Sequence, residues 1–308
     1  MIESLKRVVR RAPALEYAAY LVHNTLLPFV NFSGTSLRGR SVADAAGYVQ
    51  LVADRYRDAA RRVSRSFAGA TVLEIGPGDN LGVALCLVAW GAERVVCIDR
   101  FNCLGKHHFK GDIYRALLSG LAPAERDRAR RMCPWVEGAP PGSLEGVIQF
   151  LPGTEFESCA SALAHYRFDC VVSNAALEHL VDVAGGFAQV LPSVKSDAWM
   201  FHEVDLRCHS RFSAVSPLHF LTVPQPLWHL MGSRLGAPNR VRVNAYRQIF
   251  KQAGFEVREE VLESASRELA AATFPDVDRR IGAASAADLV PLVVRFTLLR
   301  WPRRQHEE

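Results

Sequence analysis

The sequence lacks the short motifs that assign many chains to a class of protein at first sight. Its seven cysteines include no C-x-x-C pair, and it contains no H-E-x-x-H motif, no internal repeat and no low-complexity tract. An odd number of cysteines without close pairs fits neither a disulfide framework nor a common zinc site. We therefore predict reduced, buried thiols, no metal site and a cytoplasmic protein.

Long apolar runs are missing as well. Residues 13–31 are the most apolar part of the N-terminal region, but polar residues and a proline interrupt them well short of a membrane span. An apolar segment with a small-residue cleavage site is absent, so we expect no signal peptide. Four basic residues between positions 6 and 11 precede this segment. It is predicted either to lie on a membrane surface as an amphipathic helix or to pack on its own domain.

A strong excess of one charge is also missing. The 37 basic and 32 acidic residues leave a net charge of +5, spread along the chain. This balance is too mild and too dispersed to indicate a nucleic-acid partner. With 308 residues, 49% of them hydrophobic, the chain can form one large α/β domain with additions or two small domains.

One glycine-rich stretch is present, and the predicted strands and helices can be assigned relative to it. In residues 71–82 an apolar run meets Glu74 and then three glycines, Gly76, Gly78 and Gly82. We predict a strand, a tight turn and the start of a helix. Glycine suits a turn that a ligand approaches closely, because a Cβ would block both the positive φ angles and the contact.

Strand-like and helix-like patterns alternate along the chain after this turn. The expected strands span residues 71–76, 94–99, 147–150, 168–174, 198–204, 255–262 and 292–299. Helices are expected from Ser41 as a cap to Ala60, and over 80–90, 182–191 and 246–254. Such alternation is typical of an α/β fold built on an open parallel sheet.

Two stretches interrupt the alternation. Residues 101–146 and 206–243 each hold far more chain than one connection needs, and loops of this length in a compact domain are commonly functional. The second stretch is rich in aromatic residues, histidines and prolines. We expect it to cover a substrate, because aromatic rings stack on sugars and on other ring systems.

The spacing of the glycines separates two classes of cofactor. Dinucleotide-binding turns carry G-x-G-x-x-G, whose third glycine would fall at Leu81. The run L-E-I-G-P-G at 73–78, with Asp99 ending the next strand, resembles the class I S-adenosylmethionine-dependent methyltransferases. The segments 168–179 and 253–255 resemble the same family.

This resemblance implies a fold and a cofactor. The fold would be a seven-stranded, mostly parallel Rossmann-like sheet with helices on both faces and an antiparallel last pair of strands. We place an N-terminal helical cap over residues 1–66 and the methyltransferase domain over 67–308. The cofactor would be S-adenosylmethionine, with its methionine and ribose at the glycine turn. Both ribose hydroxyls would meet Asp99, because a carboxylate can accept from two neighbouring donors.

The same resemblance implies a set of binding residues. The expected cofactor-binding residues are Glu74, Gly76, Pro77, Gly78, Asp99, Arg100, Thr154, Asn174 and Ala175. Thr154 stands for the stretch 153–155, in which the register of the adenine contact stays open. Asn80 is expected to cap the following helix rather than to touch the cofactor.

Histidines gather after the fourth and fifth strands, where open α/β sheets bind ligands at their carboxyl edge. Methyl transfer is an in-line displacement, and a hydroxyl acceptor gains from a base that takes its proton. The candidate bases are His202, His209 and His179. Glu203 or Asp205 would orient the ring. Alternatively, these histidines only hydrogen-bond loops around the site, or they bind a divalent ion together with nearby carboxylates.

The predicted function is methyl transfer to a small-molecule or carbohydrate acceptor, at oxygen. The stretch after residue 206 resembles a bacterial branch of the family associated with glycans or secondary metabolites. Two other functions stay open, because a fold does not prove an activity. One is a non-catalytic module that binds S-adenosylmethionine, and the other is a nicotinamide-dependent oxidoreductase, which Leu81 disfavours.

Overall fold

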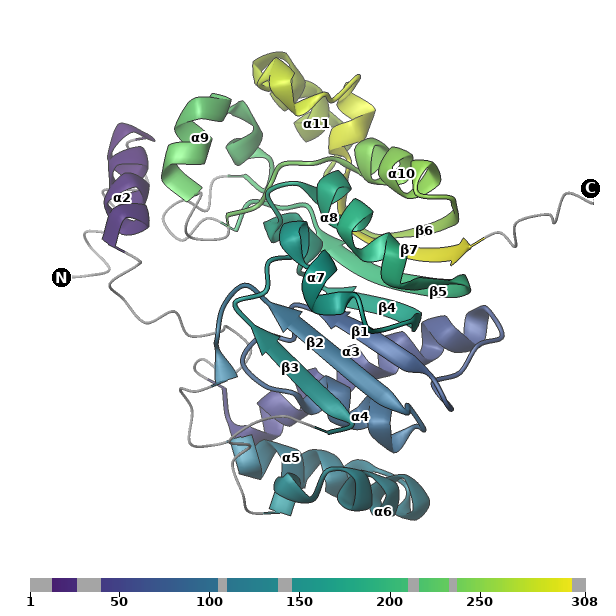
Figure 1. Cartoon of the computed structure of the whole chain (residues 1–308). Coiled ribbons are helices and arrows are strands. Elements are labelled where there is room, and N and C mark those ends of the chain that lie inside the picture. The colour runs from purple at the N-terminus through teal and green to yellow at the C-terminus, as the bar shows by residue number, and fades with distance from the viewer. Residues whose placement is uncertain are drawn as a thin grey trace, which may run out of the picture.

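A seven-stranded sheet forms the centre of the molecule (Figure 1). The computed structural model describes residues 13–26, 40–104, 110–137, 146–209, 216–232 and 237–300. The strands are β1 (Thr71–Ile75), β2 (Arg94–Asp99), β3 (Ile148–Pro152), β4 (Phe168–Asn174), β5 (Val194–Asp205), β6 (Phe255–Ser264) and β7 (Pro291–Arg300). They lie in the order β3-β2-β1-β4-β5-β7-β6.

The direction of the strands confirms the predicted Rossmann-like sheet. β1 to β5 pair in parallel, whereas β7 runs antiparallel to both β5 and β6. β5 begins at Val194, ahead of the predicted start at Ala198. After β1 the chain builds outward through β2 and β3 and then returns to the other side of β1 with β4. Ligands of open α/β sheets bind at such a reversal, outside the carboxyl ends of the strands.

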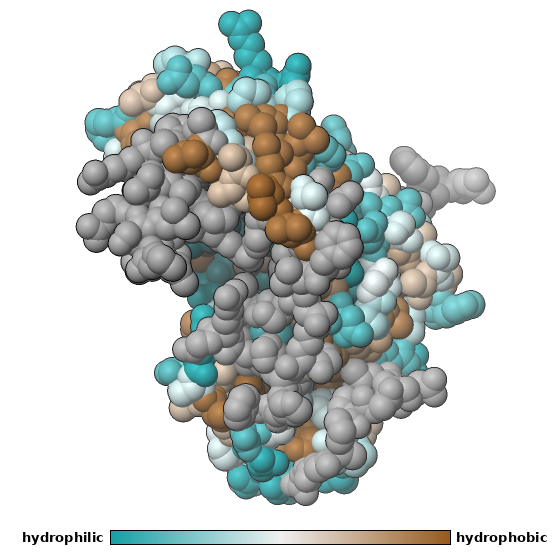
Figure 2. Space-filling view, turned by 90° about the vertical axis from the view of Figure 1, so that its left-hand side faces the viewer, coloured by the Kyte–Doolittle hydropathy of each residue, from teal (hydrophilic) through white to brown (hydrophobic). Residues whose placement is uncertain are grey.

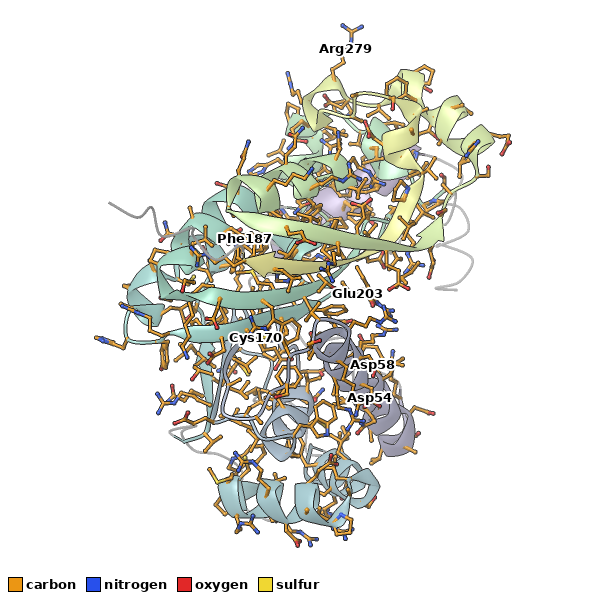
Figure 3. All side chains as sticks on the ribbon, turned by 90° about the vertical axis from the view of Figure 1, so that its right-hand side faces the viewer. Asp54, Asp58, Cys170, Phe187, Glu203 and Arg279 are labelled. Atoms are coloured by element: carbon orange, nitrogen blue, oxygen red, sulfur yellow. The ribbon has the colours of Figure 1, made fainter. Side chains whose placement is uncertain are left out.

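Two layers of helices cover the sheet, because successive strand residues point to opposite faces. Val72 of β1 belongs to the first core cluster and Leu73 to the second. The first layer consists of α3 (Val42–Arg62), α4 (Gly82–Ala89), α5 (Lys110–Gly120) and α6 (Pro123–Met132). The second consists of α7 (Ala160–Leu163), α8 (Val183–Val190) and α10 (Val243–Gln252). Figure 3 shows Cys170 and Phe187 on opposite sides of the sheet.

The helix α3 belongs to the first layer, although it lies in the predicted N-terminal cap. Ser41 caps it as predicted, with its hydroxyl accepting from the N–H of Asp44 at 3.1 Å. Tyr56 on this helix is 1% exposed and packs edge-on against Phe201 of β5. The main core therefore includes part of residues 1–66, and a division of the chain at residue 66 stays a prediction.

The first long insertion, 101–146, is mostly helical where it is described. Its helices α5 and α6 pack on α4, and the 3-10 turn η3 (Pro134–Glu137) packs on α5 and α6, all in the first core cluster. Residues 105–109 and 138–145 lie outside the described residues. The described part of this insertion extends the core of the domain.

A third core cluster lies beside the carboxyl edge of the sheet. It joins α2 (Pro13–Leu26), η7 (His219–Thr222), α9 (Gln225–Gly232), α11 (Arg267–Thr273) and η10 (Ala286–Leu289). These elements come from three parts of the chain, and only the stretch 206–243 was predicted as a cover. The insertion 265–290 between β6 and β7 was not predicted. We refer to α2 with the described parts of these two insertions as the cover.

The remaining short turns connect these elements. They are η4 (Phe156–Ser158), η5 (Leu177–His179), η6 (Leu191–Ser193), η8 (Phe274–Asp276) and η9 (Arg279–Ile281). None of the helices in the described part of the chain combines the length and the apolar character needed to cross a membrane.

Two buried arginines hold the backbone of the cover, and Arg242 also ties it to the sheet. Arg242 is 1% exposed, and its two terminal nitrogens donate to the carbonyls of Leu206 and Pro291, each at 2.7 Å. Arg240 donates to the carbonyl of Phe220 at 3.1 Å. Burial lowers the pKa of both guanidiniums to about 10, so both stay charged at neutral pH. These arginines hold backbone segments together.

Candidate functional site

The carboxyl ends of four neighbouring strands bring the predicted cofactor-binding residues together. The N–H of Gly76 donates to the carbonyl of Ile98 at 2.9 Å, and the N–H of Thr154 donates to the carbonyl of Asp99 at 3.1 Å. On the other side of β1, Ile75 is paired with Ser173, the residue before Asn174. The ends of β3, β2, β1 and β4 therefore present these predicted residues along one edge.

The glycine turn after β1 has the backbone shape expected of it. Gly76 and Gly78 have φ angles of 70° and 76°, a region that favours glycine. A Cβ on Gly76 would lie 2.8 Å from the Cβ of Ala176, in the segment after β4. The backbone of Gly76 thus passes directly beside Ala176, and a side chain at position 76 would not fit between them.

The start of α4 after this turn is occupied by the chain itself. The N–H of Leu81 donates to the Tyr114 hydroxyl at 3.1 Å, and the N–H of Gly82 donates to the Asn80 side chain at 2.9 Å. A dinucleotide pyrophosphate would need such N–H groups at the helix N-terminus. The arrangement therefore favours a ligand that rests on the glycine turn alone, and it gives Asn80 the capping role expected of it.

The third glycine, Gly82, is explained by packing. A Cβ there would lie 2.7 Å from side-chain atoms of Val49 on α3 and of Leu117 on α5. The absence of a side chain lets α4 approach both neighbouring helices. Gly82 therefore serves the core.

Two acids flank the turn, and burial raises the pKa of each. Glu74 is 3% exposed, and burial raises its pKa to about 7, although a hydrogen bond from the Cys97 thiol acts in the opposite direction. Burial likewise raises the pKa of Asp99 to about 6, although the N–H groups of Phe101 and Gly78 hydrogen-bond its carboxylate. Asp99 is therefore mostly ionised at neutral pH and presents a carboxylate at the end of β2.

The comparison with protein families agrees with this geometry. A family model described as a methyltransferase domain matches residues 48–260, from within α3 to within β6. The chain belongs to this methyltransferase family. Its cofactor is S-adenosylmethionine, and the match is to methyltransferases, not to nicotinamide-dependent oxidoreductases.

Similar solved structures are remote in sequence. A cyclopropane-fatty-acyl-phospholipid synthase-like protein from Lactobacillus casei shares 15% identity over 91% of this chain and 99% of its own, with a TM-score of 0.47. An S-adenosylmethionine-dependent methyltransferase from Mesorhizobium loti shares 14% identity over 82% of this chain and 100% of its own, with a TM-score of 0.42. A phosphoethanolamine N-methyltransferase from Haemonchus contortus, in complex with S-adenosylhomocysteine, shares 12% identity over 85% of this chain and 59% of its own, with a TM-score of 0.42. At these similarities none of the three bears on the acceptor. No curated protein matches the sequence.

The remaining predicted cofactor residues lie close to the turn but have partners already. Arg100 forms an ion pair with Glu155 at 3.2 Å at the exposed rim of the edge. Asn174 accepts from Arg55 at 3.2 Å and lies within 3.3 Å of the Tyr48 hydroxyl. Ala175 adopts a φ of 49°, and its N–H donates to the carbonyl of Glu203 at 2.9 Å. Pro77 is half-buried between the two glycines.

The predicted acceptor side holds a histidine paired with a carboxylate. Nε2 of His209 lies 3.3 Å from Oδ2 of Asp205 at the end of β5, and the rings of His209 and His179 are 5.1 Å apart. Burial alone would raise the pKa of Asp205, but hydrogen bonds from His209 and Arg207 outweigh it and hold this pKa well below its usual range. Asp205 is thus a fixed negative charge beside His209.

His202 does not join this group. The side chain of His202 is fully buried between the rings of Phe187 and Phe250, which belong to the second core cluster. Its Nδ1 lies 2.8 Å from the Ser173 hydroxyl. Burial lowers the pKa of His202 to about 3, so it stays neutral. A base must reach the acceptor, so the geometry favours His209 and His179 and assigns His202 to the interior.

Glu203 orients no histidine, contrary to one of the predicted pairings. Its carboxylate lies between two arginines, with Arg55 at 2.7 Å and Arg295 at 2.8 Å. Neither arginine was predicted at the site. Arg55 and Tyr48 are seven positions apart on α3, a spacing that places them on one helix face, but their partners on β4 and β5 could not be read from the sequence.

Glu178, next to His179, is 1% exposed, and neither of its carboxylate oxygens has a hydrogen-bond partner among the described residues. Burial raises the pKa of Glu178 well above its usual range. Within the described ranges, no three histidine, cysteine, aspartate or glutamate side chains come together as a metal site would need.

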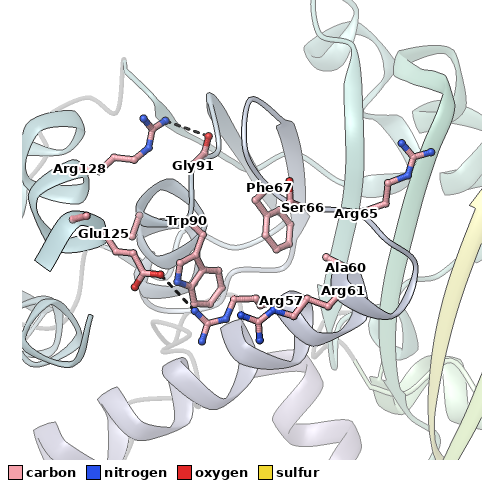
Figure 4. Close-up of a pocket in the computed structure, with 12 residues that line it drawn as sticks. Arg57, Ala60, Arg61, Arg65, Ser66, Phe67, Trp90, Gly91, Glu125 and Arg128 are labelled. Atoms are coloured by element: carbon pink, nitrogen blue, oxygen red, sulfur yellow. Dashed lines mark hydrogen bonds and ion pairs between the residues drawn. The ribbon is translucent and has the colours of Figure 1, made fainter. Parts of the chain in front are cut away.

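A separate hollow of about 430 Å³ lies at the opposite, amino edge of the sheet, near the residues that lead into β1 and β2 (Figure 4). Four arginines line it, Arg57, Arg61, Arg65 and Arg128. Three of them pair with an aspartate each, and the fourth donates to backbone carbonyls at the end of α4. Three of the four positive charges are thus paired with carboxylates, and the hollow lies at the edge of the sheet opposite to the glycine turn.

Proposed function

We propose that this chain transfers the methyl group of S-adenosylmethionine to an oxygen of a small-molecule or carbohydrate acceptor, with His209 as the general base. The pairing of His209 with Asp205 at the carboxyl end of β5 carries this proposal. The site lies on the same edge as the glycine turn, where a donor and an acceptor can meet.

The donor side fits the cofactor. Gly76 and Gly78 leave room on the turn, and Asp99 would hold the ribose hydroxyls with the carboxylate oxygens that its backbone partners leave free. Glu74 is enclosed behind the turn and would orient it. Thr154, with Arg100 beside it, would lie at the adenine, and Asn174 and Ala175 would face the methionine part.

The bound donor supplies a methyl group made electrophilic by a sulfonium. The residues of this chain supply orientation and a place for a proton. A contact between Asp205 and Nε2 of His209 makes that nitrogen the N–H donor and leaves Nδ1 as the acceptor. His179, whose ring lies beside that of His209, would narrow the space in which the acceptor hydroxyl is held.

The cover and the cysteines bear on two further parts of the proposal. The described cover lies next to the histidines, but the rings of Phe220 and Trp228, 5.6 Å apart, are 1% and 8% exposed and pack in the third core cluster. These two aromatic residues therefore stabilise the cover and do not stack on an acceptor. All seven cysteines are free thiols and six are buried, which agrees with a reducing, cytoplasmic location.

Calorimetry with S-adenosylmethionine and transfer of a labelled methyl group to a panel of sugar, phenol and carboxylate acceptors test the proposal. We expect donor binding and one productive acceptor class. His209→Gln should then lower turnover by roughly 100-fold or more while donor affinity stays the same. His165→Gln is the matched control, because His165 is exposed and lies ahead of β4, at the opposite edge.

Two outcomes would decide against parts of the proposal. If His209→Gln and His179→Gln both turn over normally, the histidines only support the loops. If the donor binds but no acceptor class is methylated, the non-catalytic binding module becomes the better description.

A further inference from the structure

We propose that the exposed face of α2 and α9 docks on the surface of a bilayer that contains anionic lipids. The helix α2 is apolar on two sides, and only one side is covered. On the covered side, Tyr20 is 8% exposed in the third core cluster, and the Asn24 amide donates to the carbonyl of Leu230 on α9 at 2.8 Å. The helix α2 therefore packs on α9 by that side.

The other side of α2 presents large apolar side chains to solvent. Leu15, Val22 and Leu26 are 48%, 58% and 52% exposed, and their spacing places them on one helix face. On the neighbouring helix α9, to which the opposite side of α2 is bound through Asn24, Leu230 is 61% exposed. We name these four residues the α2–α9 face.

This face is a concentration of exposed apolar residues rather than a scatter. Among the described residues, eight large hydrophobic side chains are exposed, and four of them belong to the α2–α9 face. Figure 2 shows hydrophobic side chains gathered in the upper part of this side of the molecule, at the height of α2 and α9 in Figure 1. Apolar residues exposed together mark an interaction surface.

The charge of the adjoining chain selects the kind of surface. Lys6, Arg7, Arg10 and Arg11 precede α2, and Glu3 is the one acid among the first twelve residues of the sequence. Basic residues directly ahead of an apolar helix in the sequence are a combination typical of binding to anionic lipid headgroups.

The α2–α9 face lies on the same side of the molecule as the candidate site. The parallel strands point toward this side in Figure 1. The segment after α9 contacts the site directly, because the N–H of Asn239 donates to the carbonyl of Glu178 at 2.6 Å. Docking by this face would bring the His179 and His209 edge close to the lipid headgroups.

Flotation of the full chain with vesicles tests this proposal. We expect the protein to float with phosphatidylcholine vesicles that contain phosphatidylglycerol, and much less with pure phosphatidylcholine. The variant V22D/L230D should lose about tenfold or more of this binding, because two apolar side chains are replaced by charges. R10E/R11E should remove the preference for phosphatidylglycerol.

Leu51→Asp is the matched control, since Leu51 is an exposed leucine on α3, 50% exposed and outside the α2–α9 face. It should float like the unchanged protein. Thermal unfolding and donor binding, measured on the same variants, separate a loss of docking from a loss of fold and from a failure of the proposed methyl transfer.

Three results would overturn the proposal. The unchanged protein could fail to float with either vesicle. Leu51→Asp could lose as much binding as V22D/L230D. Sedimentation without lipid could show a dimer that V22D/L230D converts to a monomer, which would assign the face to a second copy.

Discussion

The two halves of the carboxyl edge are built in different ways. On the donor half, the shape comes from backbone within a short stretch, namely the left-handed angles of Gly76 and Gly78 and the pairing of β1 with β2. On the acceptor half, the polar groups are held by side chains from distant parts of the chain. Glu203, for example, joins Arg55, 148 positions away, to Arg295, 92 positions away.

This difference suggests how each half responds to change. A turn made of backbone has few alternatives, so a substitution there should abolish donor binding. A carboxylate between two guanidiniums stabilises the fold only while all three groups are in place. The loss of one group leaves partly buried charge less well paired, which lowers stability. The acceptor half should therefore lose stability before it loses donor affinity.

The largest effect should follow from Gly76→Val. The new side chain would meet Ala176 and force a branched residue into a left-handed angle, so we expect donor affinity to fall by about 1,000-fold or more in calorimetry. Gly69→Val is the control, because Gly69 has a φ of 72° and free space around it. It should cost roughly 1–3 kcal/mol of stability but no donor affinity. A folded Gly76→Val protein with normal affinity would contradict the donor half as described.

The next effect should come from Glu203→Gln. The variant removes the charge of Glu203, whose side chain is 11% exposed, and leaves Arg295 with only the longer 3.8 Å pair to Glu260. We expect a loss of about 3 kcal/mol in chemical denaturation. Glu259→Gln removes an ion pair of similar length, 2.8 Å to Arg247, at a more exposed position, and should cost less than about 1 kcal/mol. Equal losses of unfolding free energy in the two variants would mean that burial adds no stability to the ion pairs of the acceptor half.

Glu74→Gln should change how stability depends on pH. Burial raises the pKa of Glu74 from 4.5 to about 7, so between these values the folded protein holds a proton that the unfolded chain has released. Stability of the unchanged protein should fall as the pH rises through this window, by roughly 3 kcal/mol in all. Glu74→Gln should lack this part of the slope, whereas Glu93→Gln, at an exposed position, should keep it. Parallel curves for the unchanged protein and Glu74→Gln would show that the buried acid is not titrating.

The smallest effect should be that of Asp99→Asn on donor binding. Asparagine can still accept from the N–H of Phe101 but loses the charge, so we expect affinity to fall by about 10- to 100-fold, or roughly 1.5–3 kcal/mol. In the unchanged protein, donor affinity should fall as the pH drops through about 6, because the carboxyl group then becomes protonated. Asp99→Asn should show no such change near pH 6, and the exposed Asp127→Asn should match the unchanged protein.

The sequence allowed the donor half to be predicted because its signals are local. The apolar run, the glycine spacing and the acid that ends β2 lie within thirty positions, and all seven strands were predicted. The pairing of Asp205 with His209 was also within reach, since the two residues are four positions apart. Two features could not be predicted because they depend on contacts between residues far apart in the sequence. They are the role of Arg55 and the insertion 265–290 that completes the cover.

His202 shows why residue type and position alone were insufficient on β5. Alternation places His202 on the same face as Met200 and Val204, but both faces of this strand are covered. The pattern therefore could not show that the histidine side chain packs among Phe187 and Phe250 instead of reaching the edge. His209 follows the strand, where side chains are free to face a ligand.

The anchoring of the cover has a consequence for engineering this enzyme family. Arg242 ties the end of β5 to the start of β7, and the cover combines α2 with two insertions that are far apart in the sequence. A graft of residues 206–243 alone into a relative would carry the apolar surface of α9 without α2 and α11, and the Arg242 guanidinium without the carbonyl of Pro291. Exchange of acceptor range between relatives should therefore require all three segments to be moved as one unit.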